Sequence, residues 1–395
     1  MIKNVFYKKH IKIILFVFII TLFSIFILQN NTAVGLNNST YDLENSYEDM
    51  LNDSNAKELF DDLPQNTKNH LSNIGISEFD WQNMLNISHD KVFLEIFNSA
   101  QENFLNNFSF FFQILAVIIL CAVVSCMNVS LDKQQLNDII NLVGILCLCV
   151  IVINPIVLCI ENMTQAVKIS ANFMLAYIPV MAGIMLAMGQ TFSSVAYNFT
   201  MATVSEIISQ TAANVLIPAL NIFLSFSIIS GLSKRLNLSS ICDMIMKLTK
   251  WLLATLMTVF TAILAAQNII SASADNASYK AIRLALGSFV PVIGSALGEA
   301  YATIQASVKI LKSGVGIFAI VATGFIFIPP MLECIIWMIT VYLCKAICDL
   351  LSMQMMSVLL DSVKNVLSVM ISIMICCMAV FIVSGFFILN TGGMI

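Results

Sequence analysis

From residue 103 to the C-terminus, long apolar runs alternate with short charged segments. Runs without a charged residue cover 103–131, 139–160, 169–205, 207–233 and 365–395. A straight helix needs about 20 apolar residues to cross the hydrocarbon core of a bilayer, and each of these runs is long enough. The pattern predicts seven or eight helical membrane elements, one or two of which are re-entrant.

One segment, Leu284–Gly298, is too short for a comfortable crossing. It lies between charged residues and holds three glycines and a proline, followed by an acid: Gly287, Pro291, Gly294, Gly298 and Glu299. Proline and glycine interrupt helices, and in a bilayer the freed backbone groups must find protein or water. The segment therefore predicts a discontinuous helix that lines an enclosed cavity. An ordinary kinked span, whose glycines serve only packing, is the alternative.

Two further sites of helix interruption are expected. The first is Pro179 with Gly183, which follow Tyr177 in an apolar run. The second is the pair Pro329–Pro330, where a break or sharp kink is expected. The sequence Tyr177–Val180 also recurs in similar form as Phe289–Val292. Paired broken segments in two halves indicate an inverted repeat with a central binding site, although four apolar positions match easily in so apolar a chain.

The N-terminal part differs in character from the rest. Residues 1–29 combine four lysines with an apolar stretch, which predicts a signal sequence; an uncleaved anchor is the alternative. Residues 30–107 carry thirteen acids and three lysines, and predict a small helical extracytoplasmic region that is either a spacer or a contact surface for partners. Residues 108–395 form the predicted multi-span membrane domain.

Composition supports a polytopic membrane protein. The chain has 395 residues, of which 59% are hydrophobic and 11% are charged, whereas soluble proteins carry about 25% charged residues. The predicted fold class is therefore all-α. No stretch is basic enough to suggest nucleic-acid binding. The 11 cysteines lie almost entirely in apolar runs, without metal-ligand spacing, so neither a metal site nor a cofactor site is expected.

Basic residues predict the orientation of the chain. Lys234 with Arg235, and Lys247 with Lys250, indicate a cytoplasmic loop. The pair Lys309 and Lys312 suggests a second one. Both can be cytoplasmic only if the chain crosses the membrane an even number of times between them.

Ionisable residues inside spans are candidate functional groups, because their burial in hydrocarbon is costly. Glu299 is the strongest of these, whereas Glu206 and Glu333 could equally mark loops or interfaces. No motif of a nucleophilic, metal-dependent or nucleotide-binding enzyme occurs, so no catalytic residue is expected. The candidate conduit and broken-helix residues are Pro179, Gly183, Glu206, Asp275, Lys280, Arg283, Pro291, Gly294, Gly298, Glu299, Pro329, Pro330 and Glu333.

The layout resembles a known family. A signal sequence, an acidic outer region and a polytopic body occur together with the segment Ala274-Asp275 and Lys280, with Pro291–Gly294, and with Lys312–Gly316. This combination is similar to stage III sporulation protein AE of endospore-forming bacteria. The resemblance covers the whole chain in layout and is specific mainly in those short segments.

The resemblance implies a role in sporulation. A family member would be made in the mother cell and reside in the outer forespore membrane as part of a channel between the two cells. Its partners would include an ATPase and ring-forming membrane proteins, and the complex would be needed for late forespore gene expression after engulfment. Two other functions remain open, namely a scaffold without a conduit of its own and a secondary transporter unrelated to sporulation.

Overall fold

The structure, a computed structural model, describes residues 56–76, 89–129, 134–232, 239–289 and 294–390. The side chains of some helical residues, among them 276–289 and 294–307, lie outside this description, as does the predicted signal sequence, residues 1–29. Every regular element in the described ranges is a helix, which confirms the predicted all-α class.

Two short helices precede the bundle. Helix α3 (Glu58–Asp61) and helix α4 (Gln65–Asn73) belong to the acidic region. They pack on the bundle through aromatic rings: Phe60 lies 6.3 Å from Phe318, and the His70 ring stacks on Phe325 at 5.9 Å, measured between centroids. His70 Nδ1 also lies 2.7 Å from a carboxylate oxygen of Glu95. This part of the acidic region is therefore docked on the bundle.

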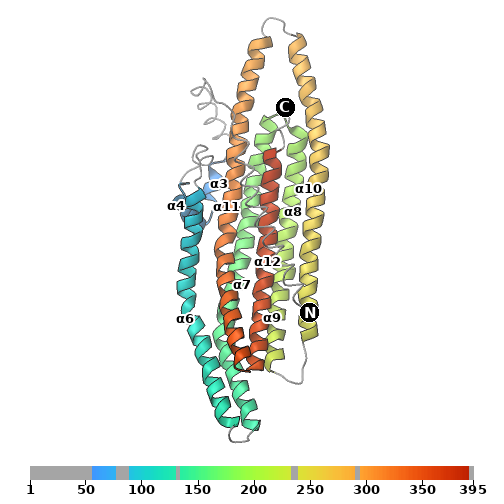
Figure 1. Cartoon of the computed structure of the whole chain (residues 1–395). Helices are drawn as coiled ribbons and strands as arrows, with labels where there is room; N and C mark the ends of the chain where they lie inside the picture. Colours follow the sequence, from blue (N-terminus) through green and yellow to red (C-terminus); the bar gives the residue numbers. More distant parts are fainter. Residues whose placement is uncertain (1–55, 77–88, 130–133, 233–238, 290–293, 391–395) are drawn as a thin grey trace.

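Long helices form the rest of the described chain (Figure 1). In chain order they are α6 (His89–Val129), α7 (Gln134–Ala187), α8 (Thr191–Thr211), the π-helix η1 (Ala212–Leu216), α9 (Ile217–Leu232), α10 (Ser239–Phe289), α11 (Gly294–Leu350) and α12 (Gln354–Asn390). Helix α6 runs through position 107, where the sequence predicts the end of the outer region, and η1 joins α8 to α9 without a loop.

Six helical stretches in the described residues are long and apolar enough to cross a membrane: Asp90–Met127, Ile139–Ala187, Thr191–Ile229, Ser240–Gln267, Val308–Leu350 and Gln354–Gly385. Seven or eight elements were expected over the whole chain, and within the described residues charged positions do not end helices. Helix α7 continues through Glu161 and Lys168, and the stretch from α8 to α9 continues through Glu206. Treating each charge as a boundary overestimates the number of spans.

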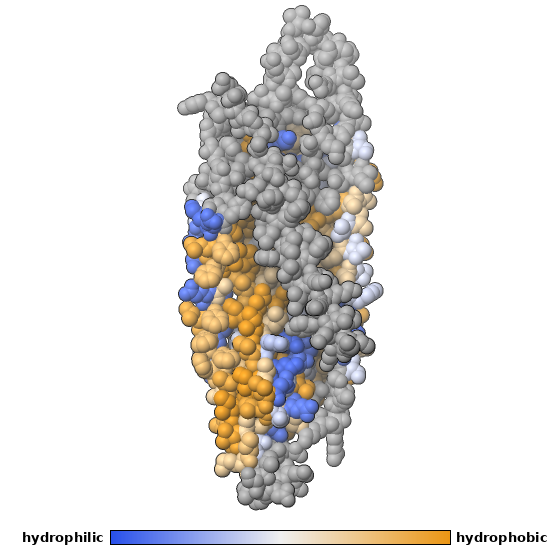
Figure 2. Space-filling model, viewed as in Figure 1, coloured by the Kyte–Doolittle hydropathy of each residue, from blue (hydrophilic) through white to orange (hydrophobic). Residues whose placement is uncertain are grey.

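The core of the bundle lies around α11 and α12, which pack along each other and contact α7 (Figure 1). Helix α11 contributes the fully buried Trp337, Phe318 and Phe327, and α12 contributes Leu367 and Met370. Outward-facing positions of α6 and α7 are apolar as well, as expected for helices that contact lipid. Figure 2 shows this hydrophobic surface over the lower parts of α6 and α7.

The prolines do not interrupt their helices. Helix α7 continues through Pro155 and Pro179, and α11 continues through Pro329 and Pro330. The predicted breaks at Pro179 and at Pro329–Pro330 are therefore wrong, whereas the alternative of a sharp kink at Pro329–Pro330 stays a prediction. A proline removes one backbone donor, but helices packed in a bundle tolerate this because their neighbours hold the chain in place.

The segment Leu284–Gly298 is not a separate short helix. It consists of the end of α10, which stops at Phe289, and the beginning of α11, which starts at Gly294; Gly298 lies in the second turn of α11. Pro291 lies outside the described residues. The ends of α10 and α11 extend beyond the other helices at the top of Figure 1, where they form a helical hairpin.

Candidate functional site: a polar corner at the break between α7 and α8

Helix α7 ends and helix α8 begins in the middle of an uncharged run, with a short turn between them. Gly189 has a φ of +74°, which glycine adopts without strain. The backbone N–H of Gln190 donates to the carbonyl of Met185 at 3.0 Å, and the N–H of Gly189 donates to that of Leu186 at 2.9 Å. These two bonds form a Schellman motif, which ends a helix and turns the chain. The turn thus lies ten residues after Pro179 and connects two candidate spans, Ile139–Ala187 and Thr191–Ile229.

Asp275 of α10 caps the helix that follows. Its two carboxylate oxygens accept hydrogen bonds from the backbone N–H groups of Phe192, at 2.9 Å, and Ser193, at 3.0 Å. These donors have no partner within α8, because the first turn of a helix leaves its N–H groups unpaired. A negative charge there also complements the helix dipole. Asp275 is only 8% exposed, so the carboxylate is committed to this contact.

Lys312 of α11 brings a positive charge to the same corner. Its ammonium group donates to the side-chain oxygen of Gln190 at 3.3 Å, and only 3% of the residue is exposed. Lys312 and Asp275 carry opposite charges, and both are buried at this corner. The corner therefore joins four helices through one buried acid, one buried cation and one set of helix N–H groups. We call Gln190, Asp275, Lys312 and the first turn of α8 the α7–α8 corner.

Of the thirteen residues predicted as candidate site residues, Asp275 alone has a described side chain in this corner. Pro179 and Gly183 are exposed on α7 before the break, and a side chain at Gly183 would meet nothing within 4 Å. Lys280 and Arg283 lie on α10, and Gly294, Gly298 and Glu299 lie at the start of α11. The side chains of these last five positions are outside the described part of the chain.

Glu206 and Glu333 lie elsewhere. Glu333 of α11 accepts a hydrogen bond from the side-chain amide of Asn162 on α7 at 2.8 Å, which links two helices of the core. Glu206 lies on the outside of α8, where its carboxylate accepts a hydrogen bond from Gln210 at 2.8 Å. Neither acid marks a loop, because both lie within continuous helices.

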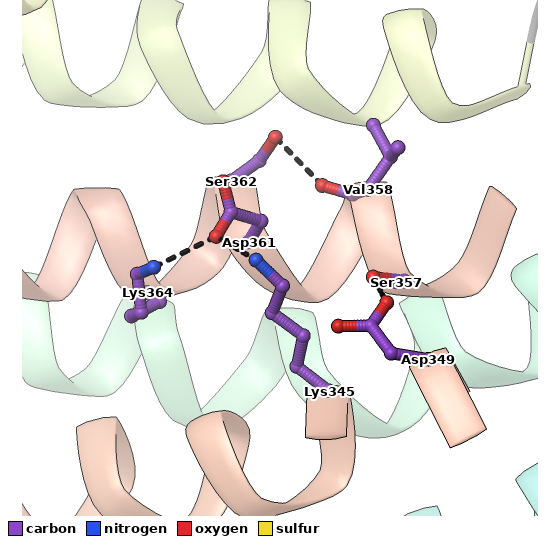
Figure 3. Close-up of polar contacts among 7 residues, drawn as sticks. All are labelled: Lys345, Asp349, Ser357, Val358, Asp361, Ser362 and Lys364. Atoms are coloured by element: carbon purple, nitrogen blue, oxygen red, sulfur yellow. Dashed lines mark hydrogen bonds and ion pairs between the residues drawn. The ribbon is translucent and has the colours of Figure 1, made fainter. Parts of the chain in front are cut away.

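Sequence reasoning missed a second polar cluster, at the turn between α11 and α12 (Figure 3). Asp361 accepts hydrogen bonds from both Lys345 and Lys364, the latter at 2.7 Å, and Ser357 donates to Asp349. Figure 2 shows hydrophilic residues interrupting the hydrophobic surface near the lower ends of these helices. Opposite charges on both sides of a tight turn were the available signal in the sequence.

No group of three potential metal ligands occurs among the residues that the structure describes. The corner offers hydrogen-bond donors, one carboxylate and one ammonium group, which can fix a helix break and bind a polar group.

The fold and the corner define a polytopic helical membrane protein in which a buried acid caps the turn between two candidate spans. The chain belongs to the stage III sporulation protein AE family, whose sequence model matches residues 76–392. It is also 19% identical, over 207 residues, to the stage III sporulation protein AE of Bacillus subtilis (strain 168). That alignment covers 52% of this chain and 52% of the relative, so it spans about half the length of each. No solved structure matches.

Proposed function

We propose that this protein is a membrane component of a sporulation-specific channel or secretion complex between mother cell and forespore. The family match carries the sporulation role, and the α7–α8 corner supports the conduit. The corner holds a buried acid and a buried lysine at the turn between two candidate spans, and buried ionisable groups in a membrane domain are typical of polar pathways and binding sites. In this proposal the complex is needed for late forespore gene expression after engulfment.

Orientation follows from the same elements. Lys247 and Lys250 lie near the start of α10, whereas Asp275 lies near its other end, at the corner that also contains Lys312. A single crossing by α10 separates the pair Lys247 and Lys250 from the pair Lys309 and Lys312, so only one of these two pairs can be cytoplasmic. The first pair, with Lys234 and Arg235, is the more basic, which puts the corner and the docked helices α3 and α4 on the extracytoplasmic side.

The proposed location is the outer forespore membrane, with residues 1–29 as the signal sequence. The corner and the part of residues 30–107 that precedes the candidate span Asp90–Met127 would then face the space between the two membranes. The partners in this proposal are an ATPase on the mother-cell side and ring-forming membrane proteins of the same complex. The docking of α3 and α4 on α11 through Phe60 and His70 favours a contact surface there rather than a free spacer.

A fluorescent reporter of late forespore transcription, scored after engulfment in a strain lacking this gene, tests the proposal. We expect a lost signal that the wild-type gene restores. A normal signal would exclude the sporulation channel and favour a secondary transporter.

A scaffold is the second candidate function, favoured by the docked α3–α4 segment. Complementation with Lys312→Met, at protein levels matched to wild type, distinguishes the two. A conduit that uses the corner requires this lysine, so the reporter signal should fall. Complementation with Lys247→Met, at an exposed position of α10, is the matched control and should restore the signal. Full activity of the Lys312 variant would favour the scaffold.

A further inference from the structure

Three polar residues form a stripe on the outside of α8. Glu206, Gln210 and Asn214 are spaced by four residues, and all three are exposed. The Gln210 amide donates to the Glu206 carboxylate at 2.8 Å, and the Asn214 amide donates to the Gln210 oxygen at 2.5 Å. We call these three residues the α8 polar stripe. The π-helix η1 begins within it, at Ala212, and such widened turns are frequent at functional sites.

The stripe lies at the depth of an apolar part of the bundle. A groove next to it is lined by Ile207, Ile208 and Thr211 of α8 and by Leu256, Val259, Phe260 and Ile263 of α10. These α10 residues belong to the candidate span Ser240–Gln267, and the stripe itself belongs to the candidate span Thr191–Ile229. Its neighbours Ile207 and Val215 are also exposed, at 47% and 49%. The stripe is thus a polar line on a surface at membrane depth.

Lipid cannot cover such a stripe at low cost. A carboxylate and two amides that face hydrocarbon lose the hydrogen bonds that water would provide, and ionisable residues in spans therefore face protein or a water-filled space. The hydrogen bonds along the stripe use only part of the hydrogen-bonding capacity of its side chains, because each amide has two N–H donors and an oxygen that accepts two bonds. The outward side of the stripe offers both donors and acceptors.

A second copy of the same chain fits this chemistry. Across a two-fold axis the same surface of each copy meets the other, so every group on the stripe must find its complement on the stripe of the second copy. Amides meet this condition, because each donates and accepts, and the Glu206 carboxylate can accept from an amide of the second copy. Polar residues of this kind hold helices together in membranes.

We propose that the α8 polar stripe is the contact surface for a second copy of this protein within the membrane. The proposal is independent of the sporulation role, because its test measures association of the full chain and not sporulation.

Photo-crosslinking in membranes tests the contact. A photoreactive amino acid replaces Ile207 in one sample and Val215 in another, both beside the stripe; the control position is Leu158 of α7, which is 55% exposed. We expect a product at twice the chain mass of 43.5 kDa from Ile207 and Val215, but not from Leu158. Two differently tagged copies, expressed together, identify the product as a pair. A crosslink within one chain, to another protein, or none at all would overturn the proposal.

A double variant tests the stripe itself. Gln210→Leu with Asn214→Leu removes both amides, and we expect roughly tenfold weaker association in detergent or liposomes, as for the loss of one or two interhelical hydrogen bonds in a membrane. The control is Thr258→Val on α10, an exposed residue whose hydroxyl already donates to the carbonyl of Ala254 in its own helix. Unchanged association of the double variant would contradict the proposal. The crosslinks from Ile207 and Val215 remain informative if the double variant does not fold.

Discussion

The carboxylate of Asp275 lies 3.0 Å from the backbone nitrogen of Ser193, although 82 positions separate the two residues. One helix thus supplies the N-terminal cap of another, and the α7–α8 break is held by a contact that neither α7 nor α8 makes alone. This relationship makes the corner accessible to simple tests.

Replacing Asp275 with Asn should weaken the corner. The amide keeps the shape of the side chain, but it loses the charge and one of the two acceptor oxygens. We expect the free energy of unfolding in detergent to fall by about 1–2 kcal/mol, the usual cost of losing a charged cap. The control is Asp243→Asn at an exposed position of the same helix, which should change stability little. Equal effects of the two variants would show that the cap contributes nothing.

Gly189 tests the break itself. Its φ of +74° strains any residue with a Cβ atom, so Gly189→Ala should lower stability by about 1–2 kcal/mol. Gly183→Ala is the matched control six residues earlier in α7, where the added methyl group meets nothing within 4 Å. That change should be neutral, or stabilise the helix by up to about 1 kcal/mol. Thermal unfolding of both variants measures the difference, and the opposite order would argue against the turn.

Ser352 offers a stabilising change at the other end of the bundle. Its φ is +58°, and the N–H of Met353 donates to the carbonyl of Cys348 at 2.9 Å, so α11 ends in the same kind of turn as α7, but without a glycine. Ser352→Gly should raise the free energy of unfolding by about 1 kcal/mol. Ser352→Ala retains a Cβ atom and should bring no such gain. A loss of stability in the glycine variant would mean that the serine side chain makes a contribution of its own.

The charged cluster at the α11–α12 turn should respond to an imbalance of charge. Asp361→Asn leaves Lys345 and Lys364 together without their carboxylate. Because the side chain of Asp361 is 34% exposed, water screens part of the repulsion between the two lysines. We expect the free energy of unfolding in detergent to fall by about 1–2 kcal/mol.

A triple variant serves as the control for this cluster. Changing Lys345 to Met, Asp361 to Leu and Lys364 to Met removes all three charges at once. The triple variant should lose less unfolding free energy than Asp361→Asn, because no buried charge is left unpaired. A larger loss of unfolding free energy in the triple variant than in Asp361→Asn would show that the attraction among the three charges itself stabilises the turn.

Charge and apolar run length in the sequence predicted the helical class. Asp275 was one of the thirteen candidate residues, but the acid expected to matter most was Glu299. Proline positions misled, since Pro179, Pro329 and Pro330 remain inside continuous helices while Gly189 makes the turn. The partners of Asp275 could not be predicted. They are backbone groups, which have no signature in the sequence, and they belong to a helix far away in the chain. Lys345 and Asp361 are only 16 positions apart, and their pairing was within reach of sequence reasoning.

The cap also has a consequence for how the protein is made. A ribosome produces the chain from its N-terminus at about 5–20 residues per second, so α8 exists for roughly 4–16 s before Asp275 has been synthesised. During that interval, the first N–H groups of α8 must be satisfied by water, lipid headgroups or the insertion machinery. The α7–α8 corner is therefore completed late in biogenesis, and a chain that stops before α10 leaves it unfinished.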